Sequence, residues 1–159
     1  MNIYVKKLIQ KYKFKGLLTD TNLLLLYIVG SLDIELIGNF KRTAHYSIDD
    51  FYIVSTFIEL FEKKIVTPHI LTEVSDFIDN RRELQGLLKI FVEEQLEERY
   101  AESKIIVQNT EFITFGLADT ATLEIAKNSY LIFIDDNPLY GFLLNSKIDA
   151  VSLSLLRAI

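Results

Sequence analysis

The chain has 159 residues, of which half are apolar and a quarter are charged, and its formal net charge is -5 at pH 7. This length predicts a single domain, residues 1–159, that is large enough to bury a hydrophobic core of its own. The chain has no cysteine and 2 histidines, which excludes disulfides, thiolate nucleophiles and a zinc site built from cysteines or several histidines. The negative charge also argues against a protein that holds nucleic acid through a broad basic surface.

The N-terminal segment is basic but contains no long apolar stretch, so we expect no secretory signal. The most apolar run, Leu23–Gly30, is too short to span a bilayer and is predicted to be a buried helix. The absence of cysteine agrees with a reducing compartment. We therefore expect a cytoplasmic protein that does not enter a membrane.

Short apolar segments alternate with segments of helical character in the first half of the chain. Helix starts are marked by a Ser47–Asp50 capping box and by a proline in a first turn. The expected elements are a buried strand at Gly16–Thr19, a helix at Leu23–Val29, a helix after Ser47, a strand at Ile65–Thr67 and a helix opened by Pro68.

The second half of the chain continues this alternation, with one longer amphipathic segment at its start. The expected elements are a long helix at Arg81–Glu102, a strand at Ile105–Val107, a helix at Leu117–Asn128, a strand at Tyr130–Ile134, a helix at Leu139–Leu144 and a last strand at Ala150–Leu153.

Strands that are apolar throughout and alternate with helices are typical of a parallel sheet covered on both faces. Ligands of such sheets bind beyond the carboxyl ends of the strands. Asp20 directly follows the first strand, and Asp135 and Asp136 follow the strand at Tyr130–Ile134. Glu73 lies about one and a half turns into the helix after the strand at Ile65–Thr67, and Asp119 lies at the start of another helix. We therefore expect these acids to meet at one end of the sheet.

Four carboxylates in one place repel one another, and a divalent cation removes that conflict. Ligation by oxygen alone favours a hard ion, Mg²⁺ or Mn²⁺, and such sites hydrolyse phosphodiesters. Each acid also has a structural alternative. Asp20 and Asp119 could be helix N-caps, Glu73 a solvated helix residue, and Asp135 with Asp136 part of a turn.

The order and spacing of these acids resemble the four motifs of PIN domains, and the resemblance covers residues 17–156. The four segments that carry it are Asp20–Asn22, Thr67–Val74, Gly116–Ala121 and Ile132–Leu139.

The resemblance implies an α/β, three-layer αβα PIN-like domain with a central parallel sheet of four or five strands. It also implies an endoribonuclease that depends on Mg²⁺ or Mn²⁺ and acts on an RNA substrate. By match of position, the metal-binding and catalytic carboxylates would be Asp20, Glu73, Asp119 and Asp136, with Asp135 and Asn22 as secondary residues of the site. The spacing to Leu139 favours Asp136 over Asp135.

The expected protein partners, an antitoxin and a second copy of the chain, are implied by the resemblance alone. Many small bacterial PIN proteins are VapC-type toxins that are held by an antitoxin protein, and PIN domains of this size are often homodimers. Both partners are therefore expectations for this chain.

Two functions other than metal-dependent RNA cleavage are also compatible with the sequence. One is a PIN fold that binds a partner or RNA without cleaving it. The other is a phosphatase with an aspartyl nucleophile, since Asp20-Thr21-Asn22 also resembles the opening motif of haloacid dehalogenases. That motif has a second Asp where Asn22 stands, so we place this alternative below the nuclease.

Overall fold

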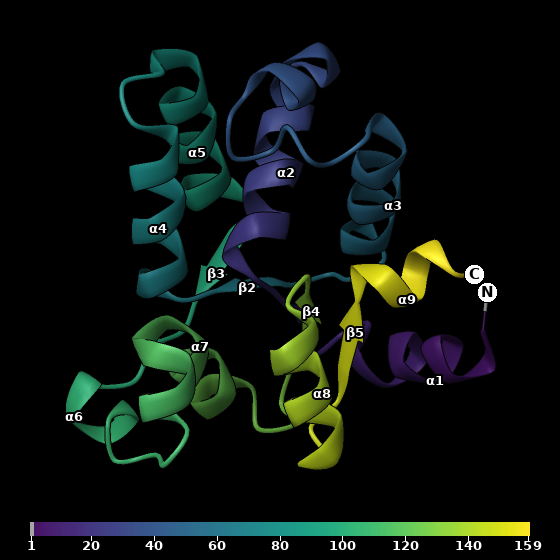
Figure 1. Ribbon diagram of the computed structural model, residues 1–159, viewed down its shortest axis with the longest axis vertical. Coiled ribbons are helices and arrows are strands. Elements are labelled where there is room, and N and C mark those ends of the chain that lie inside the picture. The colour runs from purple at the N-terminus through teal and green to yellow at the C-terminus, as the bar shows by residue number, and fades with distance from the viewer. Residues whose placement is uncertain (1) are drawn as a thin grey trace.

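The computed structural model describes residues 2–159 and contains a five-stranded parallel sheet flanked by helices, in agreement with the predicted αβα class. In Figure 1, helices α2 to α5 lie on one side of the sheet, and α1, α7 and α8 lie on the other. The strand order is β3-β2-β1-β4-β5. The strands are β1 Leu17–Thr19, β2 Lys64–Val66, β3 Leu96–Glu98, β4 Leu131–Ile134 and β5 Ala150–Ser152.

The helices cover the sheet in the order in which the chain connects the strands. They are α1 Ile3–Tyr12, α2 Thr21–Leu32, the 3-10 helix η1 Ile34–Asn39, α3 Ile48–Glu59, α4 Pro68–Ile78, α5 Arg82–Glu94, α6 Ser103–Ile106, α7 Phe112–Ala126, α8 Asn137–Asn145 and α9 Leu153–Arg157.

Strand β1 is at the centre of the sheet, where Leu17 pairs with Lys64 of β2 on one side and with Leu131 of β4 on the other. Every residue of β1 and β4 is buried, as their apolar sequences predict. Because β1 and β4 are parallel neighbours, the residues that follow them emerge at the same end of the sheet.

The predicted helix starts are present. Ser47 accepts a hydrogen bond from the amide of Asp50, whose carboxylate accepts from the amide of Ser47, so the capping box opens α3. Thr67 caps α4, with Pro68 in its first turn. The apolar run in α2 is buried from Leu23 to Gly30. Among residues 2–159, no helix has both the length and the apolar character needed to cross a bilayer.

Two predicted elements are wrong. The strand expected at Ile105–Val107 is instead part of the short helix α6 and the turn after it, and only Ile106 in it is buried. The fifth strand is β3, which lies inside the segment predicted as the long helix Arg81–Glu102. Strand β3 is at the edge of the sheet, where charged residues such as Glu97 and Glu98 can pair through their backbone while their side chains stay partly in water.

Candidate active site

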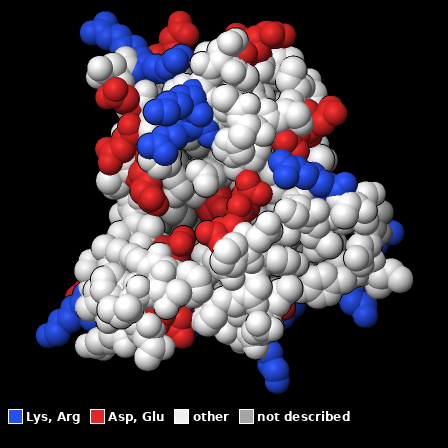
Figure 2. Space-filling view, in the orientation of Figure 1, with Lys and Arg blue, Asp and Glu red and all other residues white. Residues whose placement is uncertain are grey.

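The acids predicted to converge do follow the central strands at one end of the sheet. Asp20 comes directly after β1, and Asp135 and Asp136 come directly after β4, with Thr19 and Phe133 opposite each other in register. The prediction that Asp20 and Asp136 follow adjacent central strands is therefore confirmed. Figure 2 shows acidic side chains gathered in a hollow in the middle of this face, where the sheet end meets the surrounding helices.

Asp20 is both a helix cap and the deepest acid of the hollow. Its Oδ1 accepts a hydrogen bond of 2.9 Å from the amide of Leu23 at the start of α2. Its Oδ2 accepts one of 2.8 Å from the amide of Asp135. The pKa of Asp20 is raised to about 7, mainly by burial and also by the carboxylates of Asp135 and Asp119, while the two amides act to lower it. The carboxylate of Asp20 therefore caps α2 and also connects the end of β1 to the end of β4.

Glu73 reaches the site from α4. The hydroxyl of Thr21, in the first turn of α2, donates a hydrogen bond of 2.9 Å to Oε1 of Glu73. This contact joins the helix that follows β1 to the helix that follows β2. It fixes one oxygen of Glu73 next to the backbone position of Asp20.

Asp119 depends on a break in α7. Gly116 has φ 81° and ψ −177°, which interrupts the helix three residues before Asp119. Burial and, to a smaller extent, the carboxylates of Asp136 and Glu73 together raise the pKa of Asp119 to about 6. None of the causes of this shift is a hydrogen bond. Asp119 is therefore the acid of the site whose negative charge is least compensated.

Asp135 and Asp136 belong to different parts of the site. Oδ2 of Asp135 accepts a hydrogen bond of 2.6 Å from the hydroxyl of Tyr46. Burial, followed by this contact with Asp135, raises the pKa of the Tyr46 phenol. Asp136 caps α8 through a hydrogen bond of 2.8 Å from the amide of Leu139 and is otherwise exposed. Asp136 and Glu73 both contribute to the raised pKa of Asp119, whereas the carboxylate of Asp135 contacts Tyr46.

An ion pair lies beyond Tyr46. The guanidinium of Arg157 donates to both oxygens of Asp50, at 2.7 and 2.9 Å. These contacts hold the pKa of Asp50 below its usual value. The pair fastens α9 to the first turn of α3, and Asp50 is the main cause that raises the pKa of Arg157.

Asn22 is exposed in the first turn of α2, and its side chain makes no hydrogen bond to any described residue. Its secondary role therefore stays a prediction. Two contributors to the site were not assigned from sequence, namely Tyr46 and Arg157. Both lie far along the chain from the acids that they approach, and no local pattern marks them.

The donor set suits a hard cation, since Asp20, Glu73, Asp119 and Asp136 offer only carboxylate oxygens. Within residues 2–159, none of these four pairs with a lysine, arginine or histidine. Among these described residues, no group of three or more His, Asp or Glu side chains lies close enough together to hold an ion. The chemistry of the donors therefore fits Mg²⁺ or Mn²⁺, while several of their oxygens are bound to backbone amides or to Thr21.

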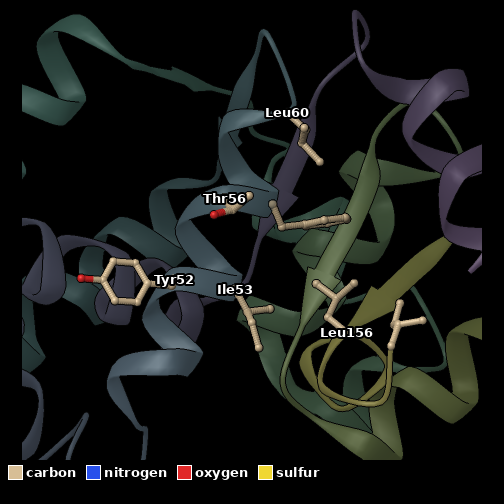
Figure 3. Close-up of a pocket in the computed structure, with 7 residues that line it drawn as sticks. Tyr52, Ile53, Thr56, Leu60 and Leu156 are labelled. Carbon is tan, nitrogen blue, oxygen red and sulfur yellow. The ribbon is translucent and has the colours of Figure 1, made fainter. Parts of the chain in front are cut away.

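A separate pocket of about 490 Å³ lies between α3 and α9 and contains none of the predicted site residues. Figure 3 shows Ile53, Leu60 and Leu156 around it, with Tyr52 and Thr56 on the same helix, α3. Its lining is apolar, so it offers no groups for acid, base or metal chemistry.

Comparison of the chain with protein-family models, with curated proteins and with solved structures found no match. The relation to PIN domains therefore stays a prediction from the motifs.

Proposed function

We propose that the protein is a PIN-type endoribonuclease that depends on a divalent metal ion, with Asp20, Glu73, Asp119 and Asp136 as its metal-binding carboxylates. One observation carries this proposal. Four acids from distant parts of the chain lie at the carboxyl end of the sheet with no basic partner among residues 2–159, and burial and mutual repulsion raise the pKa of Asp20 and Asp119. Buried negative charge without a counter-charge is costly unless a cation neutralises it.

A divalent ion bound to these acids would supply Lewis-acid activation of a water molecule and of the phosphodiester. The protein's own residues have positioning roles. Backbone amides fix both oxygens of Asp20, and Thr21 orients Glu73. The hydroxyl of Tyr46 donates a hydrogen bond to the carboxylate of Asp135 and so fixes its position. The hollow is open to solvent, which suits a long, flexible substrate such as an RNA strand.

The phosphatase alternative fits these contacts less well. An aspartyl nucleophile needs an oxygen that can approach a phosphorus atom, whereas Oδ1 and Oδ2 of Asp20 each accept a backbone hydrogen bond. Asn22, in the position of the second acid of that motif, is exposed and makes no hydrogen bond with a described residue. Both observations argue against an aspartyl nucleophile at Asp20.

The test is cleavage of a single-stranded RNA in Mg²⁺, in Mn²⁺ and in EDTA. We expect cleavage with either metal and none in EDTA. Asp119→Asn and Glu73→Gln should reduce the rate at least about a hundredfold, a loss of roughly 2.7 kcal/mol in transition-state stabilisation. Asp76→Asn, an exposed acid on the same helix as Glu73, is the matched control and should cleave normally. Cleavage that continues in EDTA, or in Asp119→Asn at the normal rate, would refute the proposal.

A further inference from the structure

Three of the five arginines have no acidic partner. Arg99 pairs with Glu97, and Arg157 pairs with Asp50. Among residues 2–159, the guanidinium groups of Arg42, Arg81 and Arg82 have no carboxylate within 4.0 Å and donate no hydrogen bond, and all three residues are exposed. Their N–H donors are therefore available for a ligand.

Aromatic rings hold two of these arginines in place. The guanidinium of Arg42 lies 4.0 Å from the ring centre of Phe77, and that of Arg81 lies 4.9 Å from the ring centre of Phe40. Stacking on a ring restrains a guanidinium while leaving the N–H groups at its edge free to bind phosphate. Arg81 and Arg82 also line one shallow hollow of about 270 Å³. A ring therefore restrains Arg42 and Arg81, and Arg82 lies beside Arg81 in the same hollow. We call these three exposed arginines the arginine surface.

The arginine surface lies close to the acidic hollow. Phe77, whose ring contacts the guanidinium of Arg42, is four residues after Glu73 on α4. Residues at this spacing share one face of a helix and lie about 6 Å apart along its axis. Figure 2 shows basic side chains gathered on the same face as the acidic hollow, above and to its left.

We propose that Arg42, Arg81 and Arg82 bind the sugar-phosphate backbone of single-stranded RNA and lead the strand into the acidic hollow. This inference rests on the proposed function, because it names the part of the substrate that the arginines hold while the acids act on a neighbouring phosphodiester. A local basic surface of this kind reconciles an RNA substrate with a net charge of -5. A single strand fits better than a duplex, because its exposed bases can stack on guanidinium planes.

The test measures binding without cleavage. A fluorescein-labelled single-stranded RNA is titrated with protein in EDTA, and its anisotropy is followed at several salt concentrations. Arg42→Gln and the double variant Arg81→Gln/Arg82→Gln should each bind several-fold more weakly, and the triple variant at least about tenfold. The slope of log affinity against log salt should fall by about 0.7 for each arginine removed. Lys7→Gln, which removes an exposed charge from α1, is the control and should change neither quantity.

Each outcome has one meaning. Unchanged affinity and salt slope in the triple variant would overturn the arginine surface and leave the metal-dependent nuclease untouched. Loss of affinity in a protein that cleaves no RNA with Mg²⁺ or Mn²⁺ would retain the surface and refute the nuclease. Binding of duplex RNA as tightly as single-stranded RNA would overturn the single-strand assignment. Arg42→Lys keeps the charge but loses the planar stack, so an affinity between those of the native protein and Arg42→Gln supports the role given to Phe77.

Discussion

The acids of the site differ in how their charge is compensated. Asp20 receives two backbone hydrogen bonds, Glu73 receives one from Thr21, and Asp136 receives one from Leu139. Asp119 is substantially buried and faces two other carboxylates, and hydrogen bonds contribute nothing to lowering its pKa. At the scale of single residues, Asp119 is therefore the position where charge costs the fold most and where a cation would relieve it most.

The first prediction is that Asp119→Asn stabilises the metal-free protein at alkaline pH. The folded-state pKa of Asp119 is about 6, above its ordinary value of 3.8, so the folded protein binds this proton more tightly than the unfolded chain does. Stability should therefore fall as pH rises from about 4 to about 6, and the loss should be complete above that range. Asparagine carries no charge and should be more stable by about 1 kcal/mol at pH 8, and not at pH 4.

Urea unfolding of both proteins in EDTA at the two pH values measures this difference. Asp76→Asn, on an exposed position, should show no such dependence on pH. An equal change in stability at pH 4 and pH 8 for Asp119→Asn would contradict the prediction.

The second prediction separates the two adjacent aspartates. Asp136→Asn should nearly abolish RNA cleavage, whereas Asp135→Asn should reduce it less than about tenfold. The reason is that Asp136 acts on Asp119, while the carboxylate of Asp135 is held by Tyr46. The amide through which Asp135 binds Asp20 belongs to the backbone and survives the substitution. The measurement is the initial rate of RNA cleavage with Mg²⁺. A larger loss of rate in Asp135→Asn than in Asp136→Asn would make Asp135 the metal-binding residue.

At the scale of elements, the placement of Asp119 depends on the break in α7. Gly116 has φ 81° with ψ −177°, a backbone conformation that is essentially restricted to glycine. A Cβ at this position would meet no atom within 4 Å, so the cost of a side chain lies in the backbone and not in crowding.

The third prediction is therefore that Gly116→Ala destabilises the protein by about 1–3 kcal/mol. It should also lower the rate of RNA cleavage, because relief of the strain moves the helical turn that carries Asp119. Gly86→Ala is the matched control, since Gly86 lies within α5 and also has free space around it. That change should stabilise the protein by about 0.5–1 kcal/mol. Urea unfolding compares the two, and equal effects of both substitutions would show that the break has no special role.

The elements that hold the site were predictable because their signals are local. A buried apolar run ending in an aspartate identified β1 and β4, and the Ser47 capping box and Pro68 marked two helix starts. Strand β3 was missed because its two glutamates continue the polar pattern of α5, and its pairing with β2 is not visible in its own sequence. Contacts between distant segments, such as Tyr46 with Asp135, could not be predicted for the same reason.

At the scale of the whole molecule, metal ions should bind the native protein and stabilise it. The fourth prediction is that Mg²⁺ or Mn²⁺ raises the midpoint of thermal unfolding at pH 8, because an ion bound only by the folded state shifts the unfolding equilibrium. At a concentration about 100 times the Kd, the gain is roughly 2.7 kcal/mol, which corresponds to about 5–11 °C for a domain of this size.

The shift is measured by differential scanning fluorimetry without RNA, so it does not depend on activity. Asp119→Asn should lose most of it, and Lys7→Gln should keep it. A metal-induced shift of the same size in Asp119→Asn would place the ion elsewhere.

The position of β1 at the centre of the sheet also has a consequence for the order in which the protein folds. Its two neighbours begin at residues 64 and 131, so β1 stays unpaired on one side until β4 has been synthesised. Contacts this distant in sequence form slowly and late. Asp135 and Asp136 arrive with β4, and only then does Asp20 gain its second amide partner. A growing chain therefore has no complete acidic centre until residues 131–136 have left the ribosome. Under the proposed function, shorter nascent chains would lack the site needed to cleave the message that encodes them.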